Sequence, residues 1–398
     1  MENKLKRIEP YLLLDAWRGI AALWVVMVHS CDAYISSGHF DLLRNPIYKV
    51  SLWGQLGVVM FFVISGYCIM GAANSAIRSG KSISRYTLDR LRRIYPPYLA
   101  ACIAVLALRM ITLALQDRHV LPLSNHHQDL PFGDYRFWLA NLTLTQGSFG
   151  VVPILIVSWS LCYEVVFYVM VGFFMSIGNL GSAVIPAVRF AVLIYAVIIS
   201  TMTSLLWLLF SPENCPFPLN LWYQFGFGAL LFAMISKGGW RSSGQLCIST
   251  FVCLMVCLGY ACFKASPIGT LDHPSPRAQA FVCVCFFCAL LLLHPYNERV
   301  SRWRCLAPLM RLGTFSYSVY LIHRTFIAFA DAGMRKIGFD GSLYVITYLV
   351  QLLTAVGAGW VFFILIERHF ISTRQERRIA VELHPSEGAP TLQKVSGV

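Results

Sequence analysis

Apolar runs of about 20 residues recur along almost the whole chain, and this feature limits most strongly the folds open to it. Each run is long enough for an α-helix to cross the hydrocarbon core of a bilayer. A helix satisfies its own backbone hydrogen bonds inside the membrane, which an open sheet cannot do. The sequence therefore predicts an all-α, polytopic integral membrane protein.

We expect about ten transmembrane helices, with boundaries fixed only to within several residues. They cover residues 12–31, 52–74, 95–116, 151–176, 184–209, 221–236, 246–264, 278–294, 312–334 and 343–366. The sixth is short and rich in glycine. We expect one membrane domain over residues 1–370, followed by a polar tail over 371–398 whose composition is typical of disorder.

Charge is scarce and unevenly distributed. Only 13% of residues are charged, against about 25% in soluble domains, too few to cover a soluble globule. The net charge of +13 would suit a nucleic-acid partner, but 21 Lys and Arg residues fall on the N-terminal side of the predicted spans and 8 on the other. This positive-inside pattern places both termini in the cytoplasm. Membrane lipid therefore accounts for the charge, and no nucleic-acid partner is expected.

Cysteines and the first residues predict neither a metal site nor a cleaved leader. The thirteen cysteines lie mostly inside apolar runs, and none forms a pair with histidines at zinc-binding spacing. We expect reduced packing residues and no metal site. The basic N-terminus and the apolar run after it resemble a signal peptide, but no small-residue cleavage site follows, which predicts an uncleaved first span.

The first span carries Asp15, Arg18 and His29, and each ionisable group at membrane depth is a candidate functional residue. Arg18 and His29 are eleven positions apart, which on a helix is about 16 Å along the axis and within about 20° of one face. An alternative is that Asp15 and Arg18 merely neutralise each other at the membrane edge. That alternative leaves His29 unexplained.

A cluster of arginines precedes the third span: Arg85, Arg90, Arg92 and Arg93. One interpretation is anchoring to anionic lipid, worth about 1 kcal/mol per basic residue. The other is that Arg90, Arg92 and Arg93 hold the phosphates of a nucleotide-like molecule, because guanidinium groups form bidentate contacts with phosphate.

Two later spans carry further polar groups. Glu164 lies in an otherwise uncharged span and needs a partner, for which an imidazole or a hydroxyl from another span is suited. Ser316, Tyr320 and His323 recur on one helical face. Hydroxyls often only hold membrane helices together, which predicts a structural role for Ser316 and Tyr320. His323 is a candidate catalytic residue.

The outer loop over residues 117–150 holds three histidines, three aspartates and several aromatic residues. Two interpretations stay open at this point. The loop is either a lid or re-entrant segment over an outward-facing site, or an amphipathic connector at the membrane interface.

Several segments, in this order along the chain, resemble the motifs of the membrane-bound acyltransferase-3 family. They are Asp15-x-x-Arg18-Gly19 with ten residues between Arg18 and His29, then Phe61–Tyr67, Arg90-Leu91-Arg92 with Tyr95-Pro96, Trp159-Ser160-Leu161-x-x-Glu164, Ser316–His323 and Glu367-Arg368. Each motif alone is weak, whereas several in order are specific, and together they extend from residue 11 to about 370. Ala16 and Trp17 depart from the usual Gly-Leu or Gly-Phe.

The resemblance implies an O-acyltransferase of the bacterial inner membrane. Such enzymes move an acyl group, often acetyl from acetyl-CoA, to a hydroxyl of a cell-envelope glycan or lipid-linked saccharide. We thus expect acyl-CoA as donor substrate, no permanently bound cofactor, and a saccharide acceptor. Arg18, Arg90, Arg92 and Arg93 are expected to hold the phosphates of coenzyme A. His29, a side chain whose ordinary pKa is about 6.5, is expected to be the general base, oriented by Glu164.

A rival hypothesis is a saccharide transporter or exporter without acyl transfer. Ionisable residues in about ten spans would serve proton coupling equally well. A purely structural scaffold is the third possibility, and it does not explain the alignment of Arg18 with His29.

Overall fold

The computed structural model describes residues 11–35, 46–118, 130–180, 185–237, 244–262, 275–338 and 344–371. Within these ranges all regular secondary structure is helical, and nine helices are long and apolar enough to cross a membrane. The all-α, multi-pass prediction is confirmed. The first ten and last 27 residues lie outside the described ranges, so the cytoplasmic orientation of the termini and the predicted tail stay predictions.

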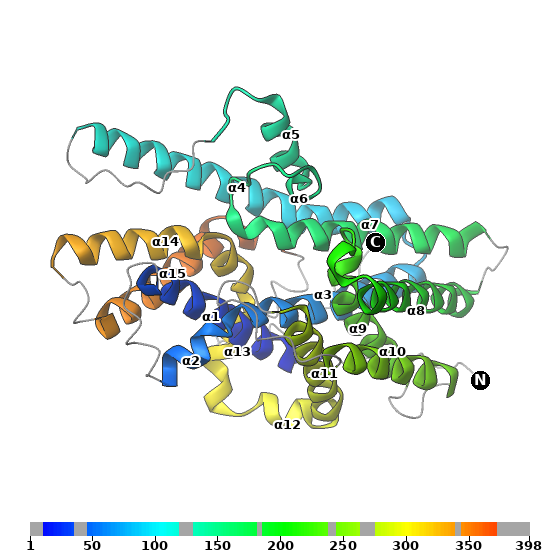
Figure 1. Ribbon diagram of the computed structural model, residues 1–398. Helices are drawn as coiled ribbons and strands as arrows, with labels where there is room; N and C mark the ends of the chain where they lie inside the picture. The colour runs from blue at the N-terminus through cyan, green and yellow to red at the C-terminus, as the bar shows by residue number, and fades with distance from the viewer. Residues whose placement is uncertain are drawn as a thin grey trace, which may run out of the picture.

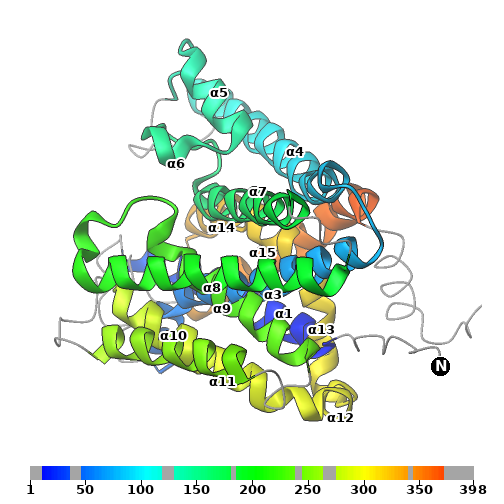
Figure 2. The same ribbon diagram turned by 90° about the vertical axis from the view of Figure 1, so that its right-hand side faces the viewer.

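The long helices are α1 (Leu13–Ile35), α3 (Gly57–Arg78), α4 (Ile83–Asp117), α7 (Trp159–Leu180), α8 (Pro186–Phe210), α9 (Leu219–Ser236), α10 (Gly244–Cys262), α11 (Pro276–Leu293), α14 (Ser316–Lys336) and α15 (Tyr344–Leu365). The short helices are α2 (Pro46–Leu52), α5 (Tyr135–Thr143), α6 (Gln146–Phe149), α12 (Asn297–Ser301) and α13 (Ala307–Thr314). Most of the long helices run side by side, with α4 at one edge of the bundle and α11 and α12 at the other (Figures 1 and 2).

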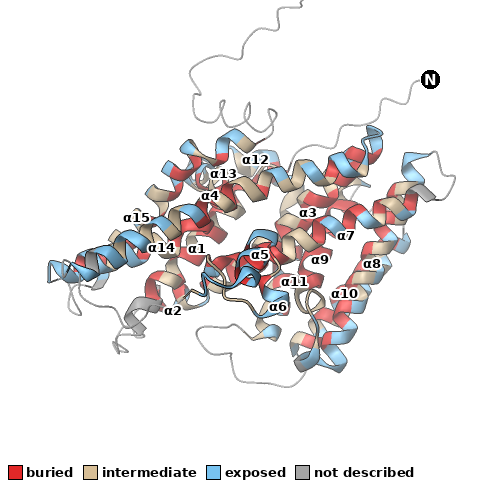
Figure 3. Ribbon diagram, turned by 90° about the horizontal axis from the view of Figure 1, so that it is seen from above, coloured by how far each residue is buried: buried red, intermediate tan, exposed pale blue. Residues whose placement is uncertain are grey.

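Helix α9 is central, because every residue from Trp222 to Met234 is buried. It corresponds to the short, glycine-rich sixth span. A Cβ atom on Gly228 would lie 1.9 Å from the carbonyl oxygen of Val63, and one on Gly66 would lie 2.0 Å from that of Phe225. The two glycines therefore let α3 and α9 pack backbone against backbone. Viewed from above, buried residues gather in α3, α9 and their neighbours (Figure 3).

The arginine cluster lies on a helix, not in the loop predicted over 75–94. Helix α4 begins at Ile83, well before the predicted start of the third span, and continues through Pro96 and Pro97. Each proline removes one intrahelical hydrogen bond. The hydroxyl of Tyr317 in α14 donates to the Ile94 carbonyl, at 2.9 Å, and adds a bond in this weakened stretch.

The ninth predicted span is divided into α13 and α14 at Phe315. Side chains satisfy carbonyl groups at the end of α13: Thr314 Oγ1 donates to Arg311 and Ser316 Oγ donates to Gly313. Such local hydrogen bonds compete with a continuous helix. Helix α14 has the length of a span but not the hydropathy, which is why nine helices rather than ten meet both criteria.

The fourth predicted span starts too early. Helix α7 begins at Trp159, not at 151, and follows a short 3-10 turn over Ile156–Ser158. Of the outer loop, residues 119–129 lie outside the described ranges, including all three of its histidines. Helix α5 buries Phe137 and Asn141 and leaves Tyr135 exposed, the pattern of an amphipathic connector.

Candidate active site

Two histidines from distant parts of the chain meet inside the bundle. His29 lies on α1 and His323 on α14, and their ring centroids are 5.2 Å apart with the planes inclined by 31°. The sequence marked each histidine separately, but nothing in their spacing predicted that they lie together. We call this pair the imidazole end of the site.

His323 is completely buried, and its ring is held through one nitrogen. Nδ1 lies 2.8 Å from the carbonyl oxygen of Tyr320 and 3.2 Å from that of Val319. Nε2 has no hydrogen-bond partner among the described residues. The neighbouring Tyr320 hydroxyl is engaged with Ser160, at 2.7 Å, as expected for a structural residue.

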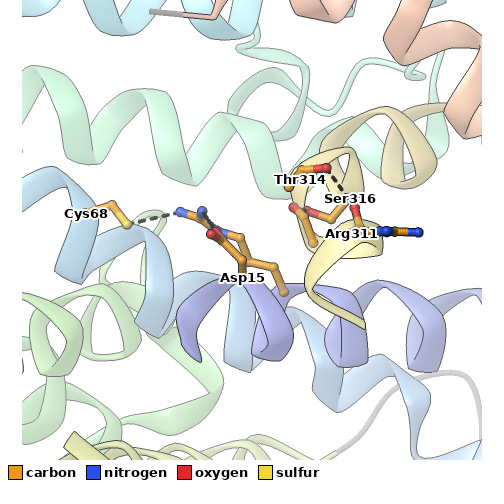
Figure 4. Close-up of polar contacts among 7 residues, drawn as sticks. Asp15, Cys68, Arg311, Thr314 and Ser316 are labelled. Carbon is orange, nitrogen blue, oxygen red and sulfur yellow. Dashed lines mark hydrogen bonds and ion pairs between the residues drawn. The ribbon is translucent and has the colours of Figure 1, made fainter. Parts of the chain in front are cut away.

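The Arg18 guanidinium lies between a carboxylate and a thiol. Its Nη1 atom is 3.0 Å from Oδ1 of Asp15, and its Nη2 atom donates to Sγ of Cys68 on α3, also at 3.0 Å (Figure 4). The predicted pairing with Asp15 is therefore present. Cys68 was expected only to fill space, and the sequence gives no signal for its contact because α1 and α3 are brought together by the fold.

Helix α13 fixes this region from the other side. A Cβ atom on Gly313 would lie 1.8 Å from the backbone oxygen of Asp15, and one on Gly19 would lie 2.1 Å from that of Leu309. Figure 4 shows Thr314 and Ser316, at the junction of α13 and α14, close to Asp15. The start of α1 thus packs backbone to backbone on α13, which sets the position of Asp15.

Glu164 belongs to the same region as Arg18. Its Oε1 atom accepts hydrogen bonds from the hydroxyls of Tyr168, at 2.9 Å, and Ser65, at 3.4 Å. The Glu164 charge acts on Arg18. The predicted hydroxyl partner from another span is found in Ser65, whereas the predicted orientation of His29 by Glu164 has no corresponding contact among the described residues.

The three arginines of α4 that were expected to hold phosphate differ in exposure. Arg92 is exposed, while Arg90 and Arg93 are half-buried, as the helical period requires for residues three apart. The charges of Arg90 and Arg93 act on the Tyr168 hydroxyl, which is bonded to Glu164. The Nε atom of Arg90 is buried and has no hydrogen-bond partner among the described residues.

Glu367 was noted only as part of a motif, but it contacts the start of the helix that carries His323. Its Oε2 atom accepts hydrogen bonds from the backbone nitrogen of Ser318, at 3.1 Å, and from the Ser318 hydroxyl. This carboxylate caps the first turn of α14, where a negative charge is favourable. Burial raises the pKa of Glu367, opposed by the Ser318 hydrogen bonds and by the charges of Arg93 and Arg18.

Arg18, Arg90, Arg93, Glu164 and Glu367 form what we call the arginine end. One face of α3 links it to the imidazole end. Cys68 contacts Arg18, Ser65 contacts Glu164, and Phe61 packs on Tyr320 with ring centroids 5.8 Å apart. Tyr320 in turn packs on His323, at 5.9 Å. The described residues contain no group of three or more His, Cys, Asp or Glu that could hold a metal ion.

Comparison with known proteins decides the family. The acyltransferase-3 family model, described as an acyltransferase domain, matches residues 11–366. The chain belongs to the acyltransferase-3 family. The resemblance drawn from the ordered motifs is thereby confirmed, and the protein is a membrane acyltransferase.

Two curated relatives of this acyltransferase are similar to it over much of their length. The "Putative membrane-bound transacylase BcsY" of Komagataeibacter xylinus is 26% identical over 317 residues, covering 78% of this chain and 71% of the relative. "Protein 2 in picA locus" of Rhizobium radiobacter is 28% identical over 169 residues, covering 40% of this chain and 78% of the relative. No solved structure matched the acyltransferase.

Proposed function

We propose that this acyltransferase moves an acyl group, with acetyl as the first candidate, from cytoplasmic acyl-CoA to a hydroxyl of a cell-envelope saccharide at the bacterial inner membrane. The observation that carries the proposal is the division of the site. Cationic side chains gather at one end and a pair of imidazoles at the other, and one face of α3 connects them. The relative named as a membrane-bound transacylase supports acyl transfer within the membrane.

The donor binds at the arginine end. Coenzyme A is a polyanion, and guanidinium groups are suited to phosphate. Arg90 and Arg93 are the residues proposed to hold it, because both face inward and Nε of Arg90 has no hydrogen-bond partner among the described residues. Arg18 already contacts Asp15 and Cys68, so we assign it a bracing role beside the donor. This arrangement agrees with the positive-inside prediction, which puts the arginine cluster in the cytoplasm.

His29 acts as general base at the imidazole end. It takes the proton of the acceptor hydroxyl as that oxygen bonds to the thioester carbonyl carbon. The carbon–sulfur bond then breaks, and the departing coenzyme A thiolate takes the proton back from His29. The ester and free coenzyme A are the products, and His29 returns to its neutral form. An imidazole is suited to this exchange because it gains and loses protons near neutral pH.

The decisive experiment is mass spectrometry of envelope saccharides from cells with and without the gene. We expect an ester-linked acyl mass to disappear in the deletion strain and to return with the wild-type gene. Purified protein should then release coenzyme A from acetyl-CoA when a glycan extract from the deletion strain is added. Translocation of unmodified glycan without acyl-CoA would instead establish the exporter hypothesis.

A further inference from the structure

The lack of a hydrogen-bond partner for Nε2 of His323 among the described residues calls for a physical explanation. A buried polar atom left without a hydrogen bond costs about 1–3 kcal/mol. His323 is 0% exposed, and no described residue approaches Nε2 to bond it. Buried groups of this kind usually have a hydrogen-bond partner, so an exception inside an active site points to a hydrogen bond that forms during the reaction.

The tautomer of His323 is set by its backbone contacts. Both atoms near Nδ1 are carbonyl oxygens, which can only accept hydrogen bonds, so Nδ1 carries a proton. In the neutral ring Nε2 then holds a lone pair and can only accept. A protonated ring would instead bury an unpaired charged donor, which costs more. The missing partner of His323 is therefore a hydrogen-bond donor.

The group best placed to donate is the ring of His29. Two imidazole rings whose centroids are 5.2 Å apart come within about 3 Å of each other when they face edge to edge, which is one hydrogen-bond length. The His29 side chain is half-buried rather than enclosed, so its ring has room to turn toward His323. Catalytic hydrogen bonds are often long in the resting enzyme and shorten when substrate is bound.

We propose that His323 is a positioning residue whose Nε2 accepts a hydrogen bond from the His29 imidazolium formed during acyl transfer. This inference rests on the proposed function. Bases in enzymes are commonly oriented by a third group, and Glu164, the expected orienting group, lies at the arginine end. A neutral imidazole takes that place. His323 exchanges no proton, since the proton taken from the hydroxyl stays on His29 until the thiolate removes it.

Two amide substitutions separate this role from helix packing. In His323→Asn the amide nitrogen lies near the position of Nδ1, so the bond to Tyr320 is kept and the Nε2 position is empty. In His323→Gln the longer side chain brings an amide oxygen to the Nε2 position, where it can accept from His29. We expect kcat to fall about a hundredfold in the Asn variant and less than about tenfold in the Gln variant. KM for acetyl-CoA should stay unchanged in both.

The opposite order, with Asn active and Gln impaired, would mean that His323 serves only through Nδ1 and would overturn the proposal. Activity is measured as coenzyme A released from acetyl-CoA with glycan extract from the deletion strain. If an amide variant fails to accumulate, His323→Ala is assayed with added imidazole. Recovery of kcat supports the proposal, and no recovery overturns it.

His29→Ala separates the proposed function from the proposed role of His323. An active His29→Ala enzyme contradicts the proposed function, whereas an inactive one with an active His323→Asn enzyme contradicts this inference alone.

Discussion

The arginine end and the imidazole end both place polar groups inside a membrane protein, but they differ in how those groups are hydrogen-bonded. At the arginine end Arg18 contacts Asp15, and Glu367 accepts hydrogen bonds from Ser318. At the imidazole end His323 is completely buried, and among the described residues it has no charged partner and its Nε2 atom has no hydrogen-bond partner. At the arginine end the unpartnered atom is Nε of Arg90, which is proposed to meet a donor phosphate, whereas at the imidazole end it is Nε2 of His323, which is satisfied only when a hydrogen-bond donor approaches.

The difference follows from what each end can tolerate. An unpaired charge at membrane depth costs several kcal/mol, so Arg18 on the first span needs its contacts with Asp15 and Cys68. An unpaired neutral acceptor costs only about 1–3 kcal/mol, which the fold can bear. The part of the site that must stay open for chemistry is thus built from histidine, and the part that must attract an anion is built from arginines on a stable scaffold.

The largest expected effect is at the imidazole end. His29→Ala should lower the acyl-transfer rate by about 10²–10⁴-fold, the usual contribution of a general base, while the protein still accumulates in the membrane. Ser30→Ala is the matched control, because Ser30 is buried on the same helix and bonds only the Val26 carbonyl among the contacts found. It should leave the rate unchanged. A His29→Ala enzyme that acylates normally would contradict the role of His29 as general base.

A smaller effect is expected at the arginine end. Arg90→Gln should raise KM for acetyl-CoA about ten- to a hundredfold, because a hydrogen bond to a charged group is worth about 1.5–3 kcal/mol. Arg92→Gln lies two positions away but is exposed, and should change KM less than about threefold. Steady-state kinetics of the two variants side by side make the comparison. Equal effects would show that the cluster acts as general surface charge and not as a phosphate site.

The smallest effect concerns the carboxylate that caps α14. Because the folded-state pKa of Glu367 is raised, the folded protein binds this proton more tightly than the unfolded chain does. Stability from this group is therefore present below about pH 4.5 and declines as pH rises through the folded pKa. Relative to Glu367→Gln, which does not titrate, the wild type should lose stability over that rise. Thermal unfolding in detergent at a series of pH values measures it, and a difference that grows with pH would contradict the sign.

The sequence predicted the membrane fold well, because hydropathy over about 20 residues is a local property. It also placed Arg18 and His29 on one helix, since a helical period needs no knowledge of the rest of the fold. It did not predict the pairing of His29 with His323, or the thiol of Cys68 beside Arg18. Both contacts join residues far apart in the chain, and no periodicity within one helix reports them.

Boundaries failed where local chemistry overrides hydropathy. The arginine cluster lowers the hydropathy of its segment, yet α4 already includes it and does not end at the prolines. Conversely, α13 and α14 were predicted as one apolar stretch, but hydroxyl side chains at Thr314 and Ser316 satisfy the carbonyls that would continue the helix. A hydroxyl partner for Glu164 from another span was predicted, but not that it would be Ser65, because which hydroxyl it meets depends on the neighbouring helix.

The glycine contacts between helix backbones have a mechanical consequence. Alternating access requires one group of helices to rock or slide against another. Here α3 and α9 are in backbone contact at Gly66 and Gly228, and α1 and α13 are in backbone contact at Gly19 and Gly313. No side chain at these glycines separates the two backbones. These pairs cannot slip without colliding. Helices locked in this way are expected to keep their relative positions during the reaction. This favours passage of the acyl group through a rigid bundle over a transporter that works by moving its helices.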